Sequence, residues 1–147
     1  MAVRLGRGGP PDPVRDHLAE VRRALMRLHK ALIDSERPVF EQSRGPVSSG
    51  QLLAALLEDP FFQWMRPFSK LMAGMDEALF GDEPVTAEGA RDFVRQVHAL
   101  VSTPEVETPD SARYEYVRGR DPAVLFAHTE VHRRVAAALL AYEDAAA

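Results

Sequence analysis

Two histidines, His128 and His132, lie four residues apart near the end of the chain, in the segment FAHTEVHRR. In an α-helix this spacing places both imidazoles on one face, one turn apart, where they could share a metal ion. His29, from an earlier segment, would complete a three-histidine site if the two helices are neighbours. Three imidazoles and an open position suit a divalent transition metal such as zinc, nickel or iron. The alternative is structural, with His128 bonded to a backbone carbonyl in the core and His132 at the core boundary.

Catalytic signatures of other kinds are missing from the sequence. No serine lies in a Gly-x-Ser-x-Gly elbow, and there is no phosphate loop or dinucleotide fingerprint. The chain has no cysteine, which excludes disulfides, thiolate metal sites and thiol catalysis. No pair of acids is placed by spacing alone for acid–base work. We therefore expect no catalytic residues, and the sequence favours a non-enzymatic protein without a cofactor.

The most apolar segment, Leu52–Met75, contains the only tryptophan of the chain. So much large apolar surface must be buried, either inside the chain or against something else. One interpretation is a packed core. The other is an interaction surface or pocket, for which the candidate residues are Phe61, Trp64, Met65, Arg66 and Phe68.

Helices are the elements that would position these side chains. The first is expected over Pro13–Ser35, where Val14, Leu18, Val21, Leu25, Leu28 and Leu32 follow a 4-3-4-3-4 spacing. Part of the following segment, Glu36–Gly50, could extend this helix, but Pro38 should kink or end it. The next helical region is broken, with a short helix over Ser49–Glu58 and a longer one over Pro60–Phe80 that begins at the cap Asp59.

In the short helix, one side is expected to carry Leu52, Leu53, Leu56 and Leu57. Pro67 should bend the longer helix, because it leaves the Gln63 carbonyl without its donor. Three further helices are expected over Ala87–Ser102, Asp110–Gly119 and Pro122–Glu143. In the last of these, the predicted buried residues are Val124, Leu125, Val131, Val135, Leu139 and Tyr142.

These elements predict an all-α fold. We expect a four-helix up-and-down bundle with a broken second helix and a short extra helix before the last one. Residues 1–11 are expected to form a flexible N-terminal tail, and residues 12–147 a single domain.

The bulk charge restricts the class of partner. The formal net charge is −4, so electrostatics gives no reason to expect nucleic acid. No apolar run is long enough to span a bilayer, and the first residues lack the apolar core of a signal peptide. A cytoplasmic location is the expectation that follows.

Two resemblances add to this interpretation. The string LLEDPFFQWMRPFS, with helical segments before and after it, resembles an uncharacterised bacterial family of small helical proteins, and this resemblance implies no activity. HTEVHRR, at 128–134, is similar to the last His-x-x-x-His-Arg of DinB-like metal-binding four-helix bundles. That family adds a histidine on its second helix, and Leu52–Trp64 has none.

Two hypotheses follow for the function. The first is a protein-interaction or scaffolding domain that self-associates as a homodimer or binds another protein, because of the apolar load on Leu52–Met75. The second is a bundle that binds a metal or small ligand, with His29, His128 and His132 as metal ligands.

Overall fold

The computed structural model describes residues 11–146, the last two by their backbone alone. The elements within this range are all helices: α1 (Pro13–Arg44), α2 (Ser49–Glu58), the 3-10 helix η1 (Pro60–Met65), α3 (Arg66–Phe80), α4 (Ala87–Val101), α5 (Pro109–Arg120) and α6 (Pro122–Ala146). The prediction of an all-α fold is confirmed. The expected N-terminal tail lies outside the described residues, except for Pro11.

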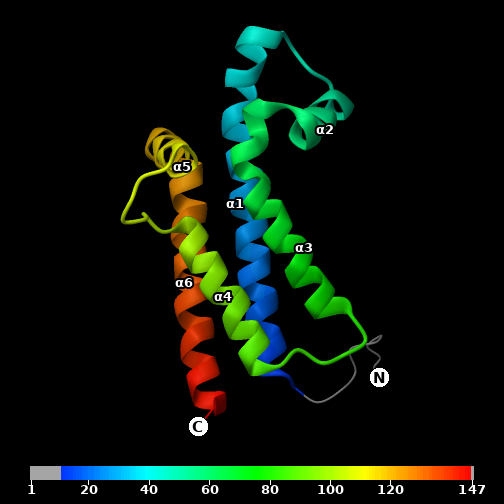
Figure 1. The fold of residues 1–147 in the computed structure, drawn as a ribbon, viewed down its shortest axis with the longest axis vertical. Coiled ribbons are helices and arrows are strands. Elements are labelled where there is room, and N and C mark those ends of the chain that lie inside the picture. Colours follow the sequence, from blue (N-terminus) through cyan, green and yellow to red (C-terminus); the bar gives the residue numbers. More distant parts are fainter. Residues whose placement is uncertain (1–10, 147) are drawn as a thin grey trace.

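Helix α1 is at the centre of the fold. In Figure 1, α1 and α6 stand side by side, while α3 and α4 cross them obliquely. The contacts agree, because α1 packs against α6, α3, α4 and α5. The predicted seam of α1 faces inward, and its buried members are Leu18, Val21, Leu25, Leu28 and Leu32.

The first helix is longer than predicted. It continues through Pro38 to Arg44, so the expectation that it ends near Ser35 was wrong. Pro38 is exposed, and water can therefore reach the Asp34 carbonyl that the proline leaves without a donor. The buried seam also continues, through Glu36 and Phe40, each one turn beyond the previous buried residue. The burial of these two side chains explains why the helix continues through a proline.

The segment after Asp59 is not one bent α-helix. Residues Pro60–Met65 form η1, and the α-helical geometry begins at Arg66. The Gln63 carbonyl accepts a bond from the Arg66 N–H, so it is not left free as predicted. Three residues per turn place Phe62 and Met65 on one face. Phe62 is consequently buried, and Phe61, which an α-helix would have turned inward, is only half-buried.

Caps and inward faces of the remaining helices differ from prediction in detail. Helix α5 begins at Pro109, one residue before the predicted start, and its cap Thr108 accepts a bond from the Ser111 N–H. In α6, Leu125 was predicted to be buried and is exposed instead.

Among residues 11–146, no helix combines the length and the apolar character that crossing a membrane requires.

Candidate functional site

Three histidine rings lie in succession where α4 packs against α6. His128 and His132 are one turn apart on α6, and their ring centroids are 4.6 Å apart. His98, near the end of α4, places its ring centroid 5.7 Å from that of His132. The rings meet nearly edge to face, at 66° and 88°. His132 is therefore the middle member of a histidine cluster formed by His98, His128 and His132.

Helix α5 supplies the polar partner of this histidine cluster. The Tyr114 hydroxyl lies 2.6 Å from His128 Nδ1, and the two groups share a hydrogen bond. Burial, with smaller contributions from the charges of His132 and Arg118, lowers the pKa of His128 to about 4. Burial also raises the pKa of Tyr114. At neutral pH the imidazole of His128 and the phenol of Tyr114 are thus both uncharged.

His29 lies elsewhere. Its ring stacks on Phe68 of α3 at a centroid distance of 6.3 Å, and burial lowers its pKa. The structure brings together two of the three predicted ligands, His128 and His132, and does not bring His29 to them. His98, which was not among the predicted ligands, is exposed and contacts His132. Within residues 11–146, no group of three or more His, Cys, Asp or Glu is arranged to hold a metal ion.

The aromatic residues proposed as an interaction surface or pocket lie mostly in the core. Trp64 is 9% exposed, and Met65 and Phe68 are buried. The Trp64 ring contacts those of Phe68 and Tyr114, each at a centroid distance of 6.5 Å. The half-buried Phe61 packs against Phe40. The chain therefore covers the side chains of Trp64, Met65 and Phe68 itself.

Arg66, the polar member of that predicted set, is exposed and has a local role. Its guanidinium donates a hydrogen bond to the Leu57 carbonyl in the last turn of α2. This bond satisfies one of the carbonyls that a helix end leaves free. Arg66 thus ties α2 to the start of α3.

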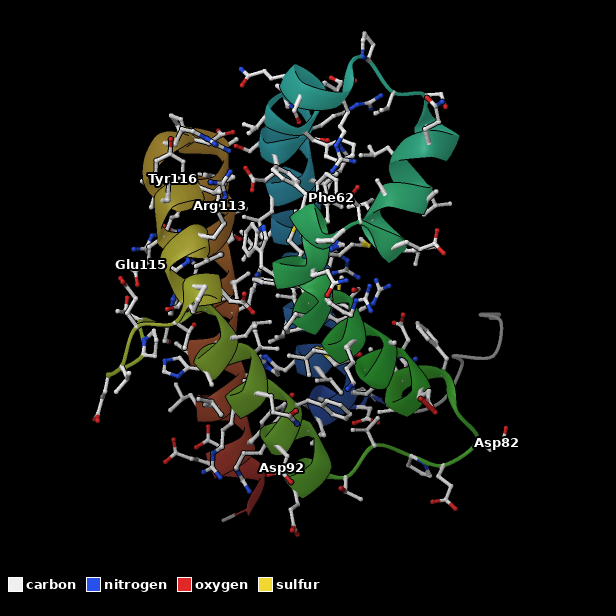
Figure 2. The ribbon with its side chains drawn as sticks, turned by 45° about the horizontal axis from the view of Figure 1, so that its top comes forward. Phe62, Asp82, Asp92, Arg113, Glu115 and Tyr116 are labelled. Atoms are coloured by element: carbon white, nitrogen blue, oxygen red, sulfur yellow. The ribbon has the colours of Figure 1, made fainter. Side chains whose placement is uncertain are left out.

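A buried carboxylate, that of Glu36, joins α1 to α5. Arg113 holds it with two bonds, from Nε to Oε2 at 2.8 Å and from Nη2 to Oε1 at 2.7 Å. Arg120 donates to Oε1 at 3.0 Å and to the Ser35 hydroxyl at 2.8 Å. Bonding to Glu36 raises the pKa of Arg113. In Figure 2, Arg113 points from α5 toward α1, whereas Glu115 points away.

Sequence analysis missed this ion-pair group, although a signal was present. Glu36 lies four residues after Leu32 and continues the apolar seam, which marks it as an inward-facing acid. Its partners could not be identified from spacing, because they lie 77 and 84 residues away on α5. Arg113 and Arg120 are therefore structural anchors that tie α5 to α1.

An apolar face remains open on α2. The structure splits the four leucines predicted to share one side, since Leu52 and Leu56 pack toward the core and Leu53 and Leu57 do not. Leu53 is 59% exposed and Leu57 is 64% exposed. Together with two exposed small residues they form the α2 outer face, which consists of Gly50, Leu53, Ala54 and Leu57. These positions are spaced i, i+3, i+4 and i+7, which is one helical stripe.

A shallow apolar groove runs between α3 and α4. It has a volume of about 680 Å³, and its lining includes Pro67, Leu71, Gly74, Phe93 and Leu100. A Cβ at Gly74 would lie 3.2 Å from Cε1 of Phe93, so a side chain there would press on that ring. The groove is thus partly a consequence of two helices that meet across a glycine.

Comparisons of the chain with protein-family models, with curated proteins and with solved structures give no match. The function is therefore inferred from the chain's own geometry.

Proposed function

We propose that this protein is a non-enzymatic interaction domain that self-associates as a homodimer through the α2 outer face. The observation that carries the proposal is the position of α2 in the fold. None of its residues is fully buried, and its main contact is with η1. In Figure 1, α2 extends to one side of the helices that surround the core. An apolar helix in this position is typical of an interaction site.

The charge pattern of α2 favours a second copy of the same chain as the partner. Glu58, in the last turn, is the single charged residue of the helix. A two-fold axis brings the same patch of both copies together, and two α2 helices crossing it antiparallel would place their Glu58 side chains at opposite ends. The centre of such a contact would consist of leucine, alanine and glycine, with no like charges opposed.

The scaffold beneath α2 is, in our proposal, a four-helix up-and-down bundle. The pairwise contacts that support it run from α1 to α6, from α6 to α4, from α4 to α3 and from α3 back to α1. These four contacts close a ring, as in a bundle. Helices α2 and α5 are then additions at one end, and α2 is free to serve an interface without a cost to the core.

The expected dimer is weak. Helix α2 has ten residues, and one face of it covers less than the roughly 800 Å² per partner of a standard stable interface. Small apolar interfaces belong to transient associations. We therefore expect dissociation constants of the order of 10–100 µM.

Sedimentation velocity with two matched variants tests the proposal. We expect the weight-average sedimentation coefficient of the native chain to rise with concentration between about 5 and about 500 µM. Leu57→Asp should abolish the rise, because the dimer would bury two new carboxylates without partners. Leu140→Asp on α6 is the control, since Leu140 is 63% exposed and Leu57 is 64% exposed.

A monomer over the whole concentration range would overturn the proposal. An equal loss of association in Leu57→Asp and Leu140→Asp would also overturn it, because the association would then not depend specifically on the α2 outer face. Both substitutions are at exposed positions, so circular dichroism should show folded proteins in each case.

A further inference from the structure

We propose that the groove between α3 and α4 binds a medium-chain carboxylate, which is a small molecule with an apolar chain and one anionic head. Lys70 and Gln96 hold the head, and the apolar floor of the groove covers the chain. The site lies apart from the α2 outer face, and the proposal does not rest on self-association through that face.

Two helical stripes form the walls of the groove. In Figure 1, α3 and α4 run in opposite directions and are joined by a loop at the bottom of the view. The stripe on α3 is spaced i, i+3, i+4 and i+7 and consists of Pro67, Lys70, Leu71 and Gly74. The stripe on α4 is spaced i, i+3 and i+7 and consists of Phe93, Gln96 and Leu100. Each stripe is one face of its helix over about two turns, or about 10 Å.

The floor of the groove is apolar and partly open. Leu71, Phe93 and Leu100 are half-buried and pack against the core, so the rest of each side chain faces the groove. The volume of about 680 Å³ lies in the range usual for small-molecule sites. Covering this floor with an alkyl chain removes apolar surface from water on both sides, which is favourable.

Lys70 gives the groove its charge. Among the described residues that line the groove, it is the single charged one. Within the same part of the chain its ammonium group forms no ion pair, whereas the other lysine, Lys30, pairs with a carboxylate at 2.7 Å. Phe93 also lines a neighbouring hollow, whose acidic residues are Glu77, Asp82 and Glu83. An anion is therefore attracted to the groove at Lys70 and repelled from the hollow beside it.

Gln96 supplies a second donor for the head. Its Nε2 donates one N–H to the Asp92 carbonyl at 3.3 Å, and the amide has a second N–H to offer. Both polar side chains of the groove thus donate, and a carboxylate accepts with two oxygens and one charge. A phosphate monoester carries nearly two charges and three strong acceptor oxygens, more than one lysine and one amide satisfy.

The length of the groove sets the length of the chain. An extended chain of about eight to ten carbons matches a stripe of about 10 Å. Because the groove is shallow, part of the bound chain stays in water, and the affinity is modest. For decanoate, with about twelve heavy atoms, we expect a dissociation constant of about 0.1–1 mM.

The test titrates the isotope-labelled full chain with sodium decanoate and follows its NMR signals. We expect the amide signal of Gly74 and the methyl signals of Leu71 and Leu100 to shift together and to saturate. The methyl signals of Leu53 and Leu57, on the α2 outer face, are the internal control and should not follow this curve. The control separates binding in the groove from adsorption to an exposed apolar face, so the result is independent of the proposed dimer.

Variants and a second ligand test the head group. Lys70→Met should weaken decanoate binding by about five-fold, and the control Lys30→Met should bind as the native chain does. Gln96→Glu replaces a donor by a carboxylate and should also weaken binding. All three positions are exposed, so the variants should fold. Decylammonium has a similar chain and the opposite charge, and it should bind the native chain more weakly than decanoate.

Three results would each overturn the proposal. The first is the absence of saturable shifts in the groove at about 10 mM decanoate, which is ten times the weakest expected dissociation constant. The second is decanoate binding by Lys70→Met as tight as that of the native chain. The third is equal binding of decanoate and decylammonium, because the groove would then not select an anion.

Discussion

The Glu36 carboxylate depends on two arginines for its place inside the fold. Its side chain has no solvent exposure, while those of Arg113 and Arg120 keep 33% and 27%. A buried charge without a partner is strongly unfavourable, whereas an arginine at this exposure can still be hydrated. When this ion-pair group is broken, the larger free-energy penalty therefore falls on the buried Glu36 carboxylate.

Arg113→Met tests this dependence. The substitution keeps most of the apolar stem and removes both bonds to the carboxylate. We expect it to lower the free energy of unfolding by about 3 kcal/mol, at the low end for a broken buried pair because Arg120 still binds Glu36. Urea unfolding measures the change. Arg23→Met, which breaks an exposed pair with Glu20, should cost no more than about 1 kcal/mol.

The neutrality of His128 gives stability a dependence on pH. Its pKa is lowered to about 4 in the folded chain, against the ordinary value of 6.5. Between these values the unfolded chain binds a proton at His128 that the folded chain does not. The contribution of neutral His128 to the free energy of unfolding is therefore lost as pH falls from 6.5 to 4. The groups that face the ring are His132 on α6 and Tyr114 and Arg118 on α5.

Urea unfolding at pH 7 and at pH 4.5, with a chelator present, measures this dependence. The difference in stability between the native chain and His128→Gln should shrink at the lower pH. If the stability difference between the native chain and His128→Gln is the same at both pH values, His128 has the same pKa in the folded and unfolded states, and the prediction is wrong.

At the scale of single residues, sequence spacing predicted side-chain contacts within one helix but did not predict contacts between helices. The i, i+4 rule placed His128 beside His132, as found. His98 lies 34 residues before His132, and its contact depends on how α4 packs against α6. No local pattern encodes that packing.

At the scale of the elements, the sequence predicted nearly every helix and misjudged two prolines. Pro38 was given too much weight, because the burial of Glu36 and Phe40 on the same helix outweighs a local break on the exposed side. Pro67 was predicted to bend an α-helix, but the residues before it form a 3-10 helix, in which the Gln63 carbonyl accepts a bond from the Arg66 N–H. The spacing of apolar residues along the sequence predicts neither burial between distant helices nor a local change from an α-helix to a 3-10 helix.

The continuation of α1 through Pro38 makes a second stability prediction. Pro38→Ala should restore the missing bond to the Asp34 carbonyl without loss of packing, since Pro38 is exposed. A proline inside a helix costs about 3 kcal/mol, offset by about 1 kcal/mol that proline gains by restricting the unfolded chain. We expect the free energy of unfolding to rise by about 1–2 kcal/mol. Pro46→Ala, in the loop after α1, is the control and should give no increase.

At the scale of the whole molecule, the apolar load of Leu52–Met75 divides between two uses. Phe62, Met65 and Phe68 complete the core, as one interpretation of the sequence held. Leu53 and Leu57 remain exposed on α2, which suits the proposed interface. The sequence could not separate these uses, because both kinds of residue lie on helices with apolar periodicity. Which of these residues are buried and which are exposed depends on how α2 packs against η1.

A single cysteine at position 54 tests the proposed dimer most directly, because the native chain has no cysteine. Ala54 is exposed near the middle of α2, where two antiparallel copies would place it close to its own counterpart. Under mild oxidation, Ala54→Cys should form a disulfide-linked dimer quickly, and the control Ala137→Cys, exposed on α6, should do so slowly. Equal rates for the two variants would contradict self-association through α2.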